Sequence, residues 1–196
     1  MARARPLALR VLSLSAGEGV TLRPIGPRDA DVLQAYVRGL SPESRYNRFF
    51  GALHELPSTE LDRVIHLDRM RQLALLAETC VDGTPILIGE ARYALAPDGL
   101  EAEFALSVAD DWRRRGLGAL LIAAVECRAR SDGARRLGGD VLRFNEPMKA
   151  LARKTGFLMA GVPRDARQVR VVKDLAHSQP ARPCETLVGS NLAVAA

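Results

Sequence analysis

The stretch that decides the fold lies near the middle of the chain and reads EAEFALSVADDWRRRGLG, from Glu101 to Gly118. Apolar and polar side chains alternate over residues 101–108, which predicts a β-strand with one buried face. Three arginines and a Gly-Leu-Gly turn follow, and the apolar run after them predicts a long helix over residues 116–130. Amide groups at such a strand-to-helix turn, the helix dipole and the arginines together favour binding of an anion such as pyrophosphate.

This turn differs from two common phosphate-binding motifs. No Gly-Lys-Ser or Gly-Lys-Thr sequence follows the glycines, so the turn is not a Walker loop. Leu121 stands where a dinucleotide-binding fingerprint needs a third glycine or alanine. The sequence therefore predicts a pyrophosphate site of another kind.

The segments around this stretch predict a single α/β domain. Asp-Gly turns join strands predicted at residues 73–81, 86–95 and 101–108, which favours an antiparallel meander. The last of these strands, the helix after it and a strand at 137–144 form a β-α-β unit, so those two strands should be parallel. Further strands are predicted at residues 20–25, 157–162 and 169–175, and further helices at 29–40, 42–50, 58–67 and 147–154. We expect a mixed, mostly antiparallel central sheet with helices on both faces.

The expected boundaries place the domain at residues 19–176. Residues 1–18 are interpreted as an N-terminal extension or an edge strand, and residues 177–196 as a C-terminal tail. The aliphatic stretch 187–195 would pack on a second copy of the chain, as in a homodimer, or be disordered. No apolar run approaches the roughly 18 residues of a membrane span, and Arg10 interrupts the only leader-like stretch, so neither a membrane segment nor a signal peptide is predicted.

Charge and cysteine content narrow the function classes. The net charge is +5 and comes almost entirely from arginines spread along the chain, which permits an anionic cofactor, an acidic partner or nucleic acid. The sequence lacks the aromatic clusters and reading motifs of nucleic-acid binders, so no nucleic-acid partner is expected. Cys80, Cys127 and Cys184 are far apart and predict neither a disulfide framework nor a metal site. We therefore expect a cytoplasmic protein in a reducing environment.

The pattern Arg113-x-x-Gly116-x-Gly118, between a strand and a helix, resembles the acyl-CoA signature of the GNAT N-acetyltransferases. Residues 145–148 and 151–157 are similar to the second half of that family, and the element order agrees over residues 20–175. A finer resemblance is to the catalytic domain of bacterial Pat-type protein lysine acetyltransferases. It rests on four segments: residues 40–50, 89–93, 102–105 and 110–112.

The resemblance implies a GNAT fold with acetyl-CoA as co-substrate. It also implies that the pyrophosphate lies against the turn, that a backbone N–H near Leu106, Ser107 or Val108 binds the thioester oxygen, and that Asn145 contacts the pantetheine arm or the acceptor. The turn residues are Arg113, Arg114, Arg115, Gly116, Leu117, Gly118 and Ala119. Asn145 has an alternative reading as simple strand-end turn chemistry, and Arg114 as part of a solvated charged surface.

An amine that attacks a thioester must lose a proton, and a carboxylate near the acyl carbon serves as general base. The resemblance places Glu103 in that role, with Phe104 and Trp112 expected to give it an apolar setting. Glu90 on the neighbouring strand is the substitute, and the alternative for Glu103 is a solvated carboxylate on a sheet face. Many family members carry a tyrosine as general acid where Ala152 stands here. Three alternatives follow: the thiolate leaves without that help, one of Tyr36, Tyr46 and Tyr93 replaces the tyrosine, or the activity is weak.

Three functions follow as hypotheses. The first is acetyl transfer from acetyl-CoA to a primary amine, with a protein lysine favoured by the Pat-like segments. The second is acetyl transfer to a small amine (a polyamine, amino acid or aminoglycoside), which the acidic residues just before the turn would suit. The third hypothesis is a regulatory acyl-CoA-binding module with little catalysis, which the absence of a tyrosine at position 152 would suit.

Overall fold

An eight-stranded sheet organises the part of the chain that this computed structural model describes, residues 10–14, 19–162, 165–180 and 184. The strand order is β1-β2-β3-β4-β5-β6-β8-β7. The strands are β1 (Arg10–Ser13), β2 (Gly19–Pro24), β3 (Gln72–Val81), β4 (Thr84–Leu95), β5 (Glu101–Val108), β6 (Arg136–Leu142), β7 (Leu158–Gly161) and β8 (Gln168–Asp174). The segment 187–195, considered above for contact with a second copy, lies outside the described residues.

Neighbouring strands pair antiparallel except β5 and β6, which are parallel. The predicted meander is confirmed: β3 turns into β4 at Asp82-Gly83, where both residues have positive φ. The predicted β-α-β unit is also confirmed, because α4 (Leu117–Ser131) crosses from β5 to β6. The last strand, β8, inserts between β6 and β7.

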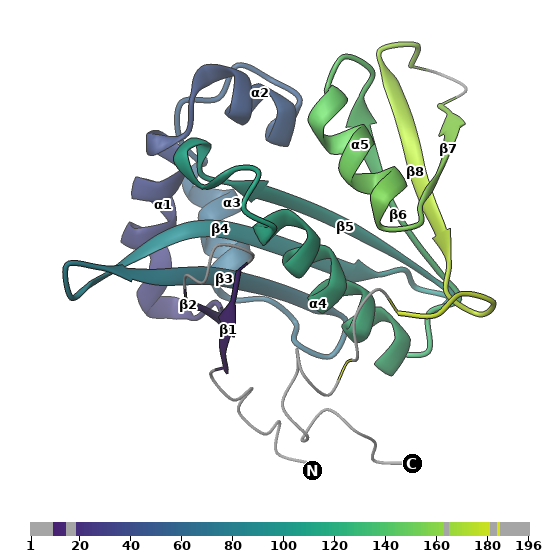
Figure 1. Cartoon of the computed structure of the whole chain (residues 1–196), viewed down its shortest axis with the longest axis horizontal. Helices are drawn as coiled ribbons and strands as arrows, with labels where there is room; N and C mark the ends of the chain where they lie inside the picture. The colour runs from purple at the N-terminus through teal and green to yellow at the C-terminus, as the bar shows by residue number, and fades with distance from the viewer. Residues whose placement is uncertain (1–9, 15–18, 163–164, 181–183, 185–196) are drawn as a thin grey trace.

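Helices cover both faces of the sheet, as predicted (Figure 1). On one face lies α4, and on the other lie α1 (Ala30–Gly39), α2 (Pro42–Phe49) and α3 (Ser58–Ile65). The fifth helix, α5 (Glu146–Lys154), joins the core on the α4 face through Ala152. Each face therefore has its own apolar cluster, and the sheet separates the two.

Helix α4 is buried almost all round, which explains its long apolar sequence. Its one internal carboxylate, Glu126, is fully buried and pairs with Lys173 of β8 at 2.9 Å and Arg130 at 2.8 Å. The Lys173 ammonium also donates to the Thr155 carbonyl at the end of α5, and the Arg130 guanidinium to the Leu175 carbonyl. Because a buried carboxylate is tolerated only when it is paired, this cluster fixes β8 and α5 against α4.

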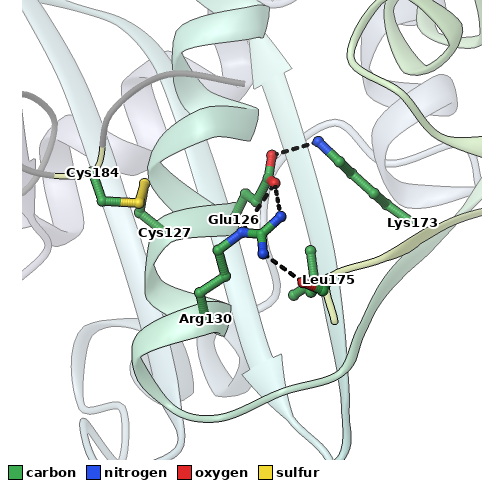
Figure 2. The surroundings of a disulfide bond; sticks show 6 residues. All are labelled: Glu126, Cys127, Arg130, Lys173, Leu175 and Cys184. Atoms are coloured by element: carbon green, nitrogen blue, oxygen red, sulfur yellow. Dashed lines mark hydrogen bonds and ion pairs between the residues drawn. A yellow bond between two sulfur atoms is a disulfide. The ribbon is translucent and has the colours of Figure 1, made fainter. Parts of the chain in front are cut away.

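A disulfide joins Cys127 of α4 to Cys184 beyond the last strand, with 5.4 Å between the two Cα atoms (Figure 2). The expectation of no disulfide was wrong. The argument from cysteine usage for a reducing environment therefore no longer holds. The two cysteines are 57 positions apart in the chain, so no local sequence pattern indicates that they pair. Cys80 is exposed and free.

Candidate active site

The parallel pairing of β5 with β6 stops early and leaves an open strand edge. Its register covers only Glu101–Glu103 on β5, opposite residues 136–138 on β6. Beyond that point β5 stays paired with β4 while β6 pairs with β8, and the two strands separate (Figure 1). The sheet therefore divides into two halves along one edge of β5.

Two backbone amides of β5 face this division. The amide of Ala109 donates to the Ile88 carbonyl of β4 at 2.9 Å, so residues 109, 107 and 105 point their N–H groups toward β4. N–H groups alternate between the two edges of a strand, so those of Leu106 and Val108 point the other way, past the last β5–β6 pair. These are two of the amides predicted to bind an acyl thioester. The third residue, Ser107, has its amide toward β4 and its side chain buried on the α1–α3 face.

The turn after β5 prepares the start of α4. Gly116 is the residue before the helix and has φ 93°, a left-handed conformation that glycine adopts without strain. The Leu120 amide makes a bond to the Gly116 carbonyl at 3.1 Å. The amides of Leu117, Gly118 and Ala119 precede it and have no partner within the helix, as in the first turn of any helix. Such amides, with the helix dipole, are the basis on which the sequence predicts an anion site, and binding at this turn stays a prediction.

The three arginines of the turn differ in their surroundings. Arg115 places its guanidinium over the Trp112 ring, 4.6 Å from the centroid. Arg113 pairs with Asp110 at 3.0 Å and is bonded to the Ser44 hydroxyl of α2. Arg114 occupies the left-handed region with φ 63°. A bound pyrophosphate would thus meet arginines that already have neighbours, of which Arg113 is tied to a different helix.

Gly118 has a packing role that the motif does not reveal. A Cβ atom at this position would lie 2.8 Å from Cδ2 of Leu151 in α5. The missing side chain therefore lets α4 and α5 approach each other. Close approach of a ligand, the reason considered from the sequence, stays a prediction.

Glu103 sits at the point where β5 and β6 part. Its carboxylate is 65% exposed and accepts from Arg170 of β8 at 2.7 Å, and Arg170 also pairs with Asp140 of β6 at 3.0 Å. The apolar setting expected from Phe104 and Trp112 is wrong, because Phe104 points into the core cluster on the opposite face. Glu103 is therefore an accessible, arginine-paired carboxylate at the inner end of the strand division.

Glu90 is buried on the α1–α3 face of β4. Its carboxylate accepts from Arg48 of α2 at 2.6 Å, from Arg92 at 3.2 Å and from the Ser107 hydroxyl at 3.0 Å. Burial works against ionisation, but Arg48 and Arg92 outweigh it and hold the pKa of Glu90 below its ordinary value. Tyr36 of α1 completes the group at 3.0 Å from the Ser107 oxygen.

Of the three tyrosines considered as general acid, Tyr36 and Tyr93 are buried, and the role of Tyr46 stays a prediction. Ala152 is fully buried in the core. The Tyr36 hydroxyl is committed to Ser107, and burial raises its pKa well above the ordinary range. Burial also raises the pKa of Tyr93 beyond its usual value. Tyr46 is partly exposed and stacks on Phe144 at the end of β6, with 6.2 Å between ring centroids.

Asn145 caps α5, since its side-chain oxygen accepts from the Met148 amide at 3.1 Å. This is the turn chemistry considered as its alternative reading, and a contact with a ligand stays a prediction. The described residues contain no group of three or more histidine, cysteine or acidic side chains able to hold a metal ion. No helix among them is long and apolar enough to cross a membrane.

Sequence reasoning did not assign three residues that the structure brings to this region. Arg48 lies on a helix that the sequence predicts, where a charged side chain reads as a surface residue, yet the structure buries it against Glu90. Ser44 and Asp110 join the start of α2 to the turn. The signal for Ser44 was present, since Ser-Pro-Glu predicts a helix start, but its partner comes from position 110.

Comparison with known proteins identifies relatives of this chain by sequence and by structure. The sequence model of the Acetyltransferase (GNAT) family matches residues 42–157. An acetyltransferase of Pseudomonas aeruginosa is 31% identical over 159 residues, which cover 81% of this chain and 86% of that protein. The crystal structure of the GNAT domain of S. lividans PAT superposes with a TM-score of 0.77 at 28% identity, covering 85% of this chain and 96% of that domain.

A more distant structure shares the fold. It is that of a putative acetyltransferase from Salmonella typhimurium with its cofactor acetyl-CoA, with a TM-score of 0.63 at 16% identity, covering 82% of this chain and 97% of that one. The family match spans more than half of the chain and includes the divided strands, the turn and α4. The protein belongs to the GNAT acetyltransferase family and is an acyltransferase.

Proposed function

We propose that the protein transfers the acetyl group of acetyl-CoA to a primary amine, and that the amine is a lysine of a protein. The observation that carries the proposal is the open edge of β5 beside the anion-binding turn. The amides of Leu106 and Val108 lie on that edge, and the first amide of α4, that of Leu117, follows nine residues after Val108. This arrangement accommodates an acyl-pantetheine arm along the strand and a pyrophosphate at the helix. The related Salmonella structure, which holds acetyl-CoA, supports that choice of acyl donor.

The chemistry assigned to the chain is direct attack on the thioester. Glu103 takes a proton from the acceptor ammonium, directly or through water, and the amine nitrogen bonds to the acyl carbon. The Leu106 N–H stabilises the oxygen that becomes negative. The nitrogen then loses its second proton to solvent, the carbon–sulfur bond breaks, and the leaving thiolate is protonated by solvent. Glu90 is the substitute base, although its burial under Arg48 leaves it less accessible than Glu103.

The charge balance around the site favours a protein lysine over a polycationic small amine. Five carboxylates precede the turn in the sequence: Glu90, Glu101, Glu103, Asp110 and Asp111. All of them except Asp111 pair with an arginine in the structure. A polyamine or aminoglycoside needs uncompensated negative charge, because each of its ammonium groups must be desolvated. The likeness to the GNAT domain of S. lividans PAT supports the same choice.

The test is thiol release from acetyl-CoA with a panel of acceptors: lysine-bearing proteins that include acyl-CoA synthetases, and separately polyamines, amino acids and aminoglycosides. We expect release with protein acceptors alone. Release with one small amine only would replace the acceptor class and keep the chemistry. Binding of acetyl-CoA without release to any acceptor would instead support the regulatory acyl-CoA-binding module.

The assignment of the base is tested with Glu103→Gln, Glu90→Gln and the control Glu101→Gln, which lies on the same strand in an exposed pair with Arg136. We expect Glu103→Gln to lower kcat by about 10²-fold or more with little change in KM for acetyl-CoA. Glu101→Gln should stay near the wild-type rate. A loss confined to Glu90→Gln would move the role of base to Glu90.

A further inference from the structure

The first turn of α2 is bound to the acyl-CoA turn by a single carboxylate. Asp110 accepts from the Ser41 amide at 2.9 Å, from the Ser41 hydroxyl at 3.1 Å and from the Ser44 hydroxyl at 2.6 Å. The same carboxylate pairs with Arg113, the first residue of the acyl-CoA signature, at 3.0 Å. Arg113 in turn bonds to the Ser44 hydroxyl. Turn and helix are thus joined by several contacts that share one side chain.

The last turn of the same helix holds the buried carboxylate of the site. Arg48 uses two nitrogens on Glu90, at 2.6 and 3.3 Å, and its side chain is only 9% exposed. Glu90 is bonded in turn to Ser107, the residue between the two amides that face the strand division. Ser41 and Arg48 are seven residues apart, about 10 Å along a helix axis, so α2 spans the distance between these two sets of contacts.

We propose that α2 is a rigid connector between the acyl-CoA turn and Glu90, with Asp110 and Arg48 as its positioning residues. Asp110 fixes one end of the helix to Arg113, and Arg48 fixes the other end to Glu90 and, through it, to Ser107. Loading of the turn and the placement of the Glu90–Ser107 pair are therefore coupled through the helix. This inference rests on the proposed function, because it takes the turn to be the acyl-CoA site.

Binding of a pyrophosphate at the turn would change the contacts that hold the start of α2. The anion attracts Arg113, which already shares its charge with Asp110, so the balance of bonds at the start of α2 changes when the turn is filled. An eight-residue helix passes such a change on as a body, since its internal hydrogen bonds keep its length fixed. The affected residue at the far end is Arg48, whose loss would leave Glu90 buried beside Arg92 alone.

A double-mutant cycle tests the coupling, with Asp110→Asn and Arg48→Gln measured singly and together. Mutations at separated sites without shared partners normally multiply in their effects. We expect each single variant to weaken CoA binding and to lower kcat by several-fold. The double variant should be no more impaired than the more strongly impaired of the two single variants. The matched control is Arg38→Gln, which removes the exposed pair between Arg38 of α1 and Glu55 in the segment before α3. Its effect should multiply with that of Asp110→Asn. Multiplicative effects for Asp110 and Arg48 would overturn the proposal.

Two further readouts separate positioning from general loss of structure. Arg48→Lys keeps the charge without the two-nitrogen contact and should recover part of the kcat lost in Arg48→Gln, with KM for acetyl-CoA closer to wild type. It also replaces Arg48→Gln in the cycle if that variant fails to fold. Equal kcat in the two Arg48 variants, where both fold, would contradict a positioning role.

Hydrogen exchange of the α2 amides gives an answer that does not depend on turnover or on the acceptor. Saturating CoA should slow exchange in α2 of the wild type and leave it unchanged in Asp110→Asn. Equal slowing in both proteins, or none in the wild type once CoA is bound, would overturn the connector. Failure of CoA to bind the wild-type chain at all would instead overturn the proposed function.

Discussion

At the scale of single residues, Gly118 shows how a motif position can serve packing as well as a ligand. Its Cα faces Leu151 so closely that an added methyl group would lie 2.8 Å from that side chain. The arginine-rich turn lies between β5 and α4, where the sequence places it, and the binding roles of its residues stay predictions. The contact with Leu151 could not be predicted, because it depends on how α4 and α5 pack.

We expect Gly118→Ala to lower the free energy of unfolding by up to about 1 kcal/mol without any ligand present. The overpacking cost against Leu151 is partly offset by the higher helix propensity of alanine. Urea unfolding of the ligand-free protein measures this. In a Leu151→Ala background the same change should cost less, because the space for the methyl group is then available. An equal cost in both backgrounds would show that the glycine is required for another reason.

Glu103 marks the limit of prediction for individual site residues. Its strand and its place before the turn follow from the sequence pattern. Its partner Arg170 is 67 positions away, and the two meet only because β8 inserts next to β6 in the sheet. Local neighbours such as Phe104 suggested an apolar setting, but alternate residues of a strand face opposite sides, so Phe104 says nothing about the surroundings of Glu103.

At the scale of elements, α2 is held by two carboxylates whose ionisation gives its attachment a pH dependence. Burial opposes ionisation of both. Arg48 and Arg92 lower the pKa of Glu90 below its ordinary value of 4.5, and hydrogen bonds from Ser44 and Ser41, with Arg113, lower that of Asp110 below 3.8. A carboxyl group with a lowered pKa in the folded state contributes stability above its unfolded-state pKa. That contribution is lost as the pH falls through the folded-state value.

The free energy of unfolding should therefore decline as the pH falls below about 4.5, as protons begin to favour the unfolded chain. Urea unfolding between pH 7 and pH 3 measures the slope. Glu90→Gln and Asp110→Asn should each be less stable at pH 7 and show a shallower decline in acid than the wild type. A wild-type slope retained in both variants would place the acid sensitivity elsewhere.

The strand order near the site illustrates why elements were easier to predict than their neighbours. Asp-Gly turns and the β-α-β unit determine local pairings, so the meander and the parallel pair were predictable. The position of β8 between β6 and β7 depends on a choice among distant partners. For the same reason the start of α2 was predictable, but its attachment to Asp110 was not, because the two bonded residues are 69 positions apart.

At the scale of the whole molecule, the Cys127–Cys184 bond closes a long loop that contains β6, α5, β7 and β8. Cross-linking restricts the unfolded chain, and for a loop of this length the chain-entropy model gives on the order of 4 kcal/mol. We expect a reductant to lower the free energy of unfolding of the wild type by about 2–4 kcal/mol. Guanidinium unfolding with and without dithiothreitol measures the change.

Cys184→Ser should match the reduced wild type and show no response to dithiothreitol. Cys80→Ser provides the matched control, since that thiol is free and exposed, and it should respond as the wild type does. Identical unfolding curves for oxidised and reduced protein would show that the bond adds no stability.

The closed loop also determines how the protein behaves when a protease cuts it. A single cleavage between positions 127 and 184 opens the backbone, yet the two fragments remain one covalent molecule through the sulfur atoms. Such a nicked chain keeps its full mass on a non-reducing gel and separates into two bands once a thiol is added. A cut before position 127 gives two separate bands even on the non-reducing gel. Comparison of the two gels therefore shows whether the cleavage lies inside or outside the loop closed by the disulfide.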